Sequence, residues 1–203
     1  MADQILNSRS PFTALPATEI WGQRDGQTIF VCPGTQALFF DRGTLERTDY
    51  QDYYPYLKEF DDARFAWELA IRRRNYVRQL ALMHSLAPGT VLADIGAGPG
   101  YLCRIAEEEG WTAYGVELSD QAVYYGMEKY GVKYRGLDDL ESRSLDSITC
   151  HHVFEHVFEP MKFLDTLYDK LKQNGLLVWH VPHQQPLTFK ARGAVQKIVG
   201  KGE

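Results

Sequence analysis

The sequence predicts an α/β protein whose core is a doubly wound, mostly parallel sheet of about five strands with helices on both faces. Two observations support this fold class. Short apolar runs alternate with helical patterns along the second half of the chain, which is typical of a parallel sheet. The first run, residues 91–95, is followed by Gly96, Gly98 and Gly100 and then by a helical pattern. Glycines at these positions let the backbone turn sharply and let a ligand approach it closely.

Composition narrows the class of protein. The 203 residues are 44% hydrophobic and 24% charged, which predicts a packed core. A net charge of −5 argues against an electrostatic nucleic-acid binder, so we expect no nucleic-acid partner. Cys32, Cys103 and Cys150 are too widely spaced for a disulfide framework or a zinc pair, which indicates reduced thiols in a cytoplasmic protein and no metal. No signal peptide or bilayer-spanning apolar run is visible, so we expect no membrane partner.

Three segments are predicted. Residues 1–58 form an N-terminal arm with a β-hairpin and a tyrosine-rich segment. Residues 59–185 form the α/β core together with the helix that leads into it, and residues 186–203 form a basic C-terminal tail. The core is long enough to be a domain of ordinary size.

The N-terminal arm combines a loose start with a hairpin. Residues 1–16 mix polar residues with prolines and are expected to be irregular. Residues 28–32 and 36–40 are short apolar runs on either side of a Pro-Gly-Thr turn, which predicts a small hairpin. Four tyrosines lie between residues 49 and 56, either as an aromatic lid over a ligand or as amphipathic packing at a domain edge.

The longest helical pattern runs over residues 61–86. It contains a cluster of arginines at positions 72, 73, 74 and 78. The cluster predicts either a site for an acidic substrate or a solvated helix face that is paired with carboxylates. After the glycine turn, the expected elements are a helix at 102–109, a strand at 112–116, a helix at 121–130, strands at 132–134 and 145–150, a helix at 161–171 and a strand at 176–181.

Two carboxylates flank the glycine turn. Asp94 lies two residues before Gly96, where a negative charge disfavours a pyrophosphate but suits a cationic amino group. A dinucleotide fold also requires its third glycine one residue later, where Tyr101 stands. Glu117 ends the next strand about twenty residues beyond the turn, the position of a carboxylate that accepts hydrogen bonds from ribose hydroxyls.

The pattern Asp94-x-Gly96-x-Gly98-x-Gly100, together with Glu117, resembles the first motif of class I S-adenosylmethionine-dependent methyltransferases of the small-molecule type (methyltransferase type 11/12/23-like). The resemblance covers residues 88–182. It implies a Rossmann-like fold, S-adenosyl-L-methionine as cofactor and S-adenosyl-L-homocysteine as product. A full member continues with a helix and a final antiparallel strand pair, for which the sequence after residue 182 is too short. We therefore expect a C-terminally truncated form, or a homodimer or other partner that covers the open sheet edge.

The resemblance also implies the cofactor-binding positions. Asp138 matches the residue that faces the adenine amino group, with Asp139 as the alternative. The full predicted set is Asp94, Gly96, Ala97, Gly98, Gly100, Tyr101, Glu117, Leu118, Leu137, Asp138, Cys150 and His151.

Candidate catalytic residues follow the strand at 145–150. His151 and His152 stand where the donor methyl group is expected, and histidine titrates near neutral pH. Glu155 and His156 form an acid–histidine pair that either orients a base or ties the following helix to the core. A metal site in this segment is disfavoured because no second cluster of ligands accompanies it.

The sequence thus predicts an S-adenosylmethionine-dependent methyltransferase that acts on an oxygen, nitrogen or carbon atom of a small molecule, such as a sugar or a quinone-like natural product. One alternative is a non-catalytic methyltransferase-like domain that serves as a binding module or scaffold. A second, less favoured alternative is an NAD-dependent oxidoreductase, which the glycine spacing and Asp94 oppose.

Overall fold

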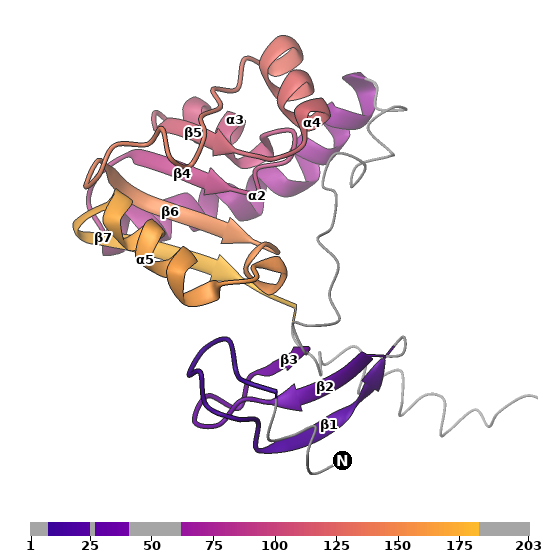
Figure 1. The fold of residues 1–203 in the computed structure, drawn as a ribbon. Helices are drawn as coiled ribbons and strands as arrows, with labels where there is room; N and C mark the ends of the chain where they lie inside the picture. Colours follow the sequence, from indigo (N-terminus) through magenta and orange to yellow (C-terminus); the bar gives the residue numbers. More distant parts are fainter. Residues whose placement is uncertain (1–7, 25–26, 41–61, 183–203) are drawn as a thin grey trace, which may run out of the picture.

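The computed structural model describes residues 8–24, 27–40 and 62–182 (Figure 1). The tyrosine-rich segment at 49–56 and the basic tail at 186–203 lie outside the described residues, so both expectations stay predictions. The division of the chain at residues 58 and 185 also stays a prediction, because both boundaries fall in or next to these ranges.

A parallel sheet of four strands forms the core. Its strands are β4 (Val91–Ile95), β5 (Thr112–Val116), β6 (Leu145–His151) and β7 (Leu171–His180), in the spatial order β5-β4-β6-β7. All three pairings are parallel. The predicted α/β fold class is thereby confirmed. The strand expected at 132–134 is reduced to a single bridge between Gly115 and Tyr134, at the β5 edge.

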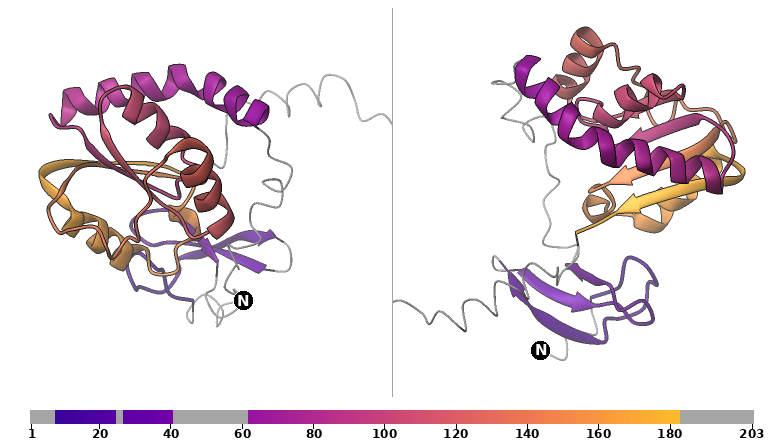
Figure 2. Two further views of the ribbon diagram at one scale, coloured as in Figure 1. Left: turned by 90° about the horizontal axis from the view of Figure 1, so that it is seen from above. Right: turned by 180° about the vertical axis from the view of Figure 1, so that it is seen from behind.

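Helices cover both faces of this sheet (Figures 1 and 2). Helices α2 (Asp62–Leu86) and α3 (Tyr101–Glu108) lie over one face, where Met83 and Ile105 pack against Leu92 of β4. Helix α5 (Pro160–Lys170) lies over the other face, where Leu167 packs with Ile148 of β6. Since the sheet has a buried apolar layer on each face, its strands are apolar throughout rather than alternating.

Two elements differ from their predicted bounds. The helix expected at 121–130 consists of α4 (Asp120–Tyr124), capped by the Ser119 hydroxyl, followed by a π-helix, η4 (Tyr125–Lys129). Strand β7 begins at Leu171 rather than at residue 176, because Leu171 already pairs with β6 before residues 172–175 bulge out of register. Asn174 has φ 64° in this bulge, in the left-handed region of backbone conformation.

The N-terminal segment forms a separate antiparallel sheet with the order β1-β2-β3. Its strands are β1 (Glu19–Arg24), β2 (Gln27–Val31) and β3 (Leu38–Phe40). The predicted hairpin is confirmed as β2–β3, and β1 is a further strand that the sequence does not predict. Residues 8–16 contain no helix or strand, as expected, but they are packed rather than loose. Ser8 and Ser10 are buried, and the Ser10 hydroxyl donates a hydrogen bond to the Cys32 sulfur at 2.8 Å.

Candidate functional site

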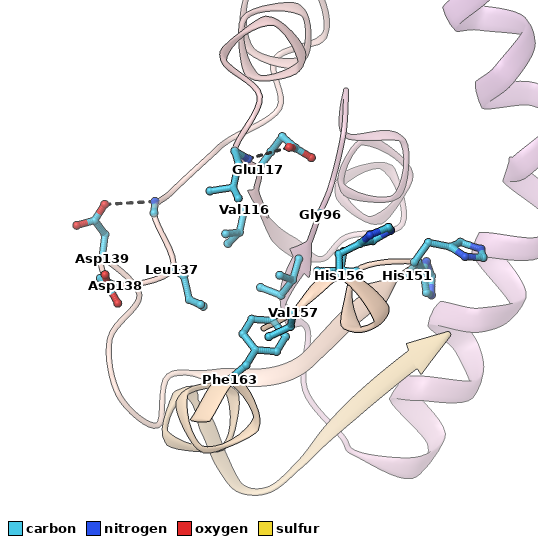
Figure 3. Close-up of a pocket in the computed structure, with 15 residues that line it drawn as sticks. Gly96, Val116, Glu117, Leu137, Asp138, Asp139, His151, His156, Val157 and Phe163 are labelled. Atoms are coloured by element: carbon cyan, nitrogen blue, oxygen red, sulfur yellow. Dashed lines mark hydrogen bonds between the residues drawn. The ribbon is translucent and has the colours of Figure 1, made fainter. Parts of the chain in front are cut away.

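A cavity of about 730 Å³ opens at the carboxyl ends of β4, β5 and β6 (Figure 3). This is the edge of an open parallel sheet at which α/β proteins bind their ligands. The volume lies in the range of about 300–1,000 Å³ that small-molecule sites occupy. Glycine, carboxylate and histidine positions predicted from the sequence meet in its wall, at Gly96, Glu117, Asp138 and His151.

The glycine turn forms the end of β4. Gly96, Gly98 and Gly100 have φ values of 71°, 54° and 84°, in the left-handed region that favours glycine. A Cβ atom on Gly96 would lie 2.2 Å from Cγ2 of Val153, so the cavity wall has no room for a side chain there. Only Gly96 of the three lines the cavity. Gly100 instead caps α3.

Glu117 ties the glycine turn to the end of β5. Its Oε2 accepts a hydrogen bond from the Gly98 N–H at 2.8 Å, and its Oε1 accepts from the N–H groups of Leu118 at 2.7 Å and Ser119 at 2.9 Å. A carboxylate has about four lone-pair positions, so these backbone donors use most of its capacity. A bidentate contact with two ribose hydroxyls therefore requires the carboxylate to release a backbone partner.

Asp94 lies beneath the turn rather than in the cavity wall. It is 6% exposed, and the Thr149 hydroxyl donates a hydrogen bond of 2.7 Å to its Oδ1. Burial raises the pKa of Asp94 to about 7, and the nearby negative charge of Glu117 adds to the rise. Its predicted contact with a cationic amino group stays a prediction. A cation placed above the turn would favour the ionised form of this acid.

The loop after the bridge at residue 134 carries the residues that are predicted to contact adenine. Leu137, Asp138 and Asp139 all line the cavity. Asp139 Oδ2 accepts a hydrogen bond from the Gly136 N–H at 3.2 Å, so this carboxylate stabilises its own loop. Asp138 makes no side-chain hydrogen bond or ion pair to any residue that the structure describes. The structure therefore favours Asp138 over Asp139 as an acceptor for a ligand.

His151, the last residue of β6, is held by the inner face of α2. Its Nε2 lies 3.2 Å from Nε2 of Gln79, and its ring stacks against Tyr76 with a centroid distance of 6.2 Å. The pKa of His151 is lowered, mainly by burial and further by His180 and His152. The imidazole is therefore neutral at pH 7 and able to accept a proton.

The remaining candidate catalytic residues lie in the segment after β6. His152 has φ 56°, an uncommon conformation for a non-glycine residue, and its Nδ1 lies 3.6 Å from Oε1 of Glu155. His156 closes the short 3₁₀ helix η5 (Phe154–His156) and lines the cavity. The N-cap of α5 is Glu159, and the two predicted roles of the Glu155–His156 pair, orienting a base or tying the next helix to the core, both stay predictions. Within residues 8–24, 27–40 and 62–182, no three His, Cys, Asp or Glu residues are placed to hold a metal ion.

The structure divides the predicted cofactor residues into two groups. Those in the cavity wall are Gly96, Glu117, Leu118, Leu137, Asp138 and His151. Those outside it are Asp94, Ala97, Gly98, Gly100, Tyr101 and Cys150. Tyr101 lies outside the cavity wall because the first turn of α3 faces α2. There its ring stacks on that of Phe65 with a centroid distance of 4.8 Å. Cys150 is buried in the core, and burial raises the pKa of its thiol to about 12.

Apart from Leu118 and Leu137, the sequence does not identify the apolar residues of the cavity wall. The others are Ile95, Val116, Val153, Val157 and Phe163. Nothing in the sequence separates such residues from core residues, because a strand end and a helix face look alike whether they cover a cavity or a neighbouring element. Val153 is the exception in principle, since it follows the histidines at the end of a predicted strand.

The fold and the glycine turn together define a class I S-adenosylmethionine-dependent methyltransferase domain, as the sequence predicts. Residues 69–197, more than half of the chain, match the family described as "Methyltransferase domain". The chain therefore belongs to this methyltransferase family.

Curated proteins that match the chain at low sequence identity are also methyltransferases. The chain is 27% identical over 122 residues to the mitochondrial ubiquinone biosynthesis O-methyltransferase of Schizosaccharomyces pombe, covering 52% of this chain and 43% of that protein. It is 23% identical over 154 residues to the ubiquinone biosynthesis O-methyltransferase of Hahella chejuensis, covering 66% and 63%. The chain thus spans between 43% and 63% of the length of these two relatives.

Solved structures support the fold alone. A putative S-adenosyl-L-methionine-dependent methyltransferase from Methanococcus maripaludis superimposes with a TM-score of 0.52 at 12% identity, over 77% of this chain and 75% of that one. A putative methyltransferase structure from Haloferax volcanii, solved with the Trm112 methyltransferase activator, gives 0.50 at 19% identity, over 66% and 59%. Among the described helices, none has the length and apolar character needed to span a bilayer.

Proposed function

We propose that this chain binds S-adenosylmethionine in the cavity at the carboxyl edge of the sheet and transfers its methyl group to an oxygen atom of a small molecule. The observation that carries the proposal is the meeting of Gly96, Glu117, Asp138 and His151 around one cavity. The names of the curated relatives support oxygen as the acceptor atom and a quinone-like phenol as the acceptor class.

The cavity fits the donor in size and in the chemistry of its wall. Gly96 places backbone in the cavity wall, where the methionine part of the donor can contact it, and Val153 fills the place that a Cβ atom would take. Glu117 offers carboxylate oxygens that can exchange a backbone N–H for a ribose hydroxyl, and Asp138 offers an acceptor for an adenine N–H₂. Leu137 and Phe163 offer apolar surface on which an adenine ring can lie.

The bound donor supplies an electrophilic methyl group on a sulfonium ion. The protein's part is to hold an acceptor oxygen in line with that methyl group, which alone contributes a large share of the acceleration. His151 then accepts the proton that the acceptor hydroxyl loses, because its lowered pKa keeps the ring neutral at pH 7. Gln79 and Tyr76 orient the ring for this transfer.

Calorimetric titration with S-adenosylhomocysteine tests donor binding. We expect micromolar binding by the wild-type chain and a loss of about tenfold to a hundredfold for Glu117→Ala, because both a ribose contact and the anchor of the glycine turn are removed. Glu141→Ala is the matched control, since Glu141 is an exposed glutamate that does not line the cavity. Equal affinity of the wild type and Glu117→Ala would contradict the proposed site, and preferential binding of NAD would contradict the donor itself.

Transfer of a labelled methyl group tests the reaction. A panel of catechols, simple phenols and matched aromatic amines is offered with the labelled donor, and we expect label in the phenol oxygens. Donor binding without transfer to any member of the panel would favour the alternative of a non-catalytic methyltransferase-like domain. His151→Ala should abolish most of the transfer and leave donor affinity within a few fold, because the ring contributes to proton removal rather than to donor binding.

A further inference from the structure

The outer face of α2 carries large apolar side chains and arginines in one stripe. We call it the outer stripe, and it consists of Arg64, Trp67, Ile71, Arg74, Arg78 and Leu82. Their spacing of three or four residues places them on one side of the helix. Trp67 and Leu82 are each 60% exposed and Ile71 is 50% exposed. The opposite side of α2 is buried through Phe65, Leu80 and Met83.

The predicted arginine cluster divides between two environments. Arg72 pairs with Glu68 at 2.8 Å, and Arg73 pairs with Glu108 and Glu109, as expected for a solvated face matched by carboxylates. Arg74 and Arg78 form no ion pair with any residue in the described part of the chain. The outer stripe itself contains no acid, so it is a positive strip on a chain whose net charge is −5.

This combination of arginines and large apolar side chains is unusual for a helix face that contacts only solvent. Solvated helix faces usually mix both signs of charge and carry few large apolar residues. Helices that lie on membranes instead combine tryptophan, leucine and other apolar side chains with arginine or lysine. From Arg64 to Leu82 the stripe advances by 18 positions, about 27 Å of helix. Helix α2 itself is too polar to cross a bilayer.

We propose that the outer stripe of α2 docks on an anionic membrane surface. Arg74 and Arg78 would meet lipid phosphates, while Trp67, Ile71 and Leu82 enter the boundary between headgroups and acyl chains. A bilayer fits better than an acidic protein because the stripe runs along much of a long helix that lies along the outside of the core (Figure 2). It has apolar and cationic groups intermixed along one line. This inference departs from the expectation of no membrane partner.

The inference goes beyond the proposed methyl transfer and does not depend on it. The inner face of the same helix contacts His151 through Tyr76 and Gln79. A docked α2 would therefore hold the histidine side of the cavity one helix diameter, about 10 Å, from the lipid headgroups. An acceptor with an apolar tail could then reach the cavity from the bilayer.

Co-sedimentation with vesicles tests the proposal without any methyl donor. The vesicles contain either equal parts of phosphatidylglycerol and phosphatidylcholine or phosphatidylcholine alone. We expect binding to the anionic vesicles at low salt, little binding to the neutral ones, and loss of binding at high salt. Each arginine at an anionic surface is worth about fivefold in affinity, so R74Q/R78Q should bind roughly thirtyfold more weakly than the wild type.

Two further variants serve as a charge control and as a probe of tryptophan insertion. K129Q/K162Q removes the same charge from exposed positions outside α2 and should bind within about twofold of the wild type. Trp67→Phe should bind but lose most of the blue shift in tryptophan fluorescence that vesicles induce in the wild type. Failure of the folded wild type to bind anionic vesicles at low salt would overturn the proposal. So would equal losses in R74Q/R78Q and K129Q/K162Q, which would indicate a diffuse charge effect.

Discussion

The two walls of the cavity are built in different ways. The glycine wall, formed by the turn after β4 and by Glu117 after β5, is held by backbone groups, with three N–H donors on a single carboxylate. The histidine wall, formed by residues 151–157 at the end of β6, also has backbone hydrogen bonds, such as that from the His152 N–H to the His180 carbonyl at 2.8 Å, but the ring of His151 is positioned by side chains of α2 such as Gln79.

This difference separates a rigid recognition surface from an adjustable one. Backbone geometry at the glycine wall is restricted by positive φ values and by close packing, so one added methyl group disturbs it. The histidine wall depends on contacts between exposed or half-buried side chains, each of modest strength. We therefore expect substitutions in the glycine wall to have large effects and substitutions in the histidine wall to have graded ones.

The largest effect is expected for Gly96→Ala. The new Cβ atom would lie 2.2 Å from Val153 Cγ2, and alanine is strained at φ 71°. We expect a loss of about 3 kcal/mol in the free energy of unfolding and at least a hundredfold loss in affinity for S-adenosylhomocysteine. Urea denaturation and calorimetry measure the two effects.

Gly110→Ala is the matched control for this substitution. Gly110 has φ 85°, but no heavy atom lies within 4 Å of the place that a Cβ atom would take, so this glycine carries the strain without the collision. The substitution should cost only about 1–2 kcal/mol and leave donor affinity unchanged. If both variants behaved alike, the collision with Val153 would not be what makes the glycine wall rigid.

A second large effect concerns the acid beneath the glycine wall. The pKa of Asp94 is about 7 in the folded protein, against 3.8 as its ordinary value. Between these pH values the folded state holds a proton that the unfolded state has released, so this group makes stability fall as pH rises from about 4 to about 7. The total is on the order of a few kcal/mol.

Asp94→Asn should remove this dependence. The stability of the variant relative to the wild type is expected to rise from pH 4 to pH 7 and then to level off, as followed by urea midpoints across that range. Thr149→Val should instead extend the pH dependence. It deletes the hydrogen-bond donor to Asp94 Oδ1 and should therefore raise the pKa of Asp94 further. A constant difference between Asp94→Asn and the wild type at all pH values would show that Asp94 has an ordinary pKa.

The same contrast explains what can be predicted from the sequence. The glycine wall follows from local rules: alternate glycines after an apolar run, and an acid at the end of the next strand. These rules place Gly96, Glu117 and Leu118 at the ligand edge of the sheet, and the structure has all three in the cavity wall, while their contacts with a donor stay predictions. The deeper position of Asp94 does not follow, since the strand pattern does not reveal how far below the turn a side chain lies.

The sequence predicts where the histidine wall lies but not which side chains contact its histidines. The end of β6 is recognisable, and the structure has His151 and His156 at the cavity, although their catalytic roles stay predictions. The contacts of His151 with Gln79 and Tyr76 join residues more than seventy positions apart, and no local pattern specifies such a pairing. Strand β1 is not predicted, for a similar reason. It has no apolar run of its own, and it forms a strand through its pairing with β2.

A smaller, graded effect is expected at Gln79. In Gln79→Glu a carboxylate would stand where an amide now lies 3.2 Å from His151 Nε2, and an opposite charge at that distance favours the imidazolium. We expect the pKa of His151 to rise by about one unit or more, as measured by NMR titration of the histidine rings. At pH 7 a rise of one unit should lower methyl transfer by up to about threefold, with the acidic limb of the pH profile moved to higher pH.

Asn75→Asp is the matched control for Gln79→Glu. It adds the same negative charge one turn earlier in α2, at an exposed position. The pKa of His151 should then move by only a few tenths of a unit, because water screens the charge. Equal shifts in the two variants would mean that Gln79 has no specific hold on His151.

The smallest effect is expected for Glu155→Gln. The 3.6 Å contact between Glu155 Oε1 and His152 Nδ1 joins side chains that are 26% and 55% exposed, and such a pair contributes at most about 1 kcal/mol. We expect less than a twofold change in donor affinity and a change of a few tenths of a kcal/mol in the free energy of unfolding, measured by calorimetry and urea denaturation.

Methyl transfer is the sharper readout for Glu155→Gln, with His151→Ala as the comparison. A catalytic acid–histidine pair would make the two variants lose transfer alike while both keep their donor affinity. A pair that only shapes the surface would leave transfer by Glu155→Gln close to that of the wild type, which is the result we expect. In the first case the histidine wall would be as intolerant of substitution as the glycine wall, and the contrast between them would lie only in how each is built.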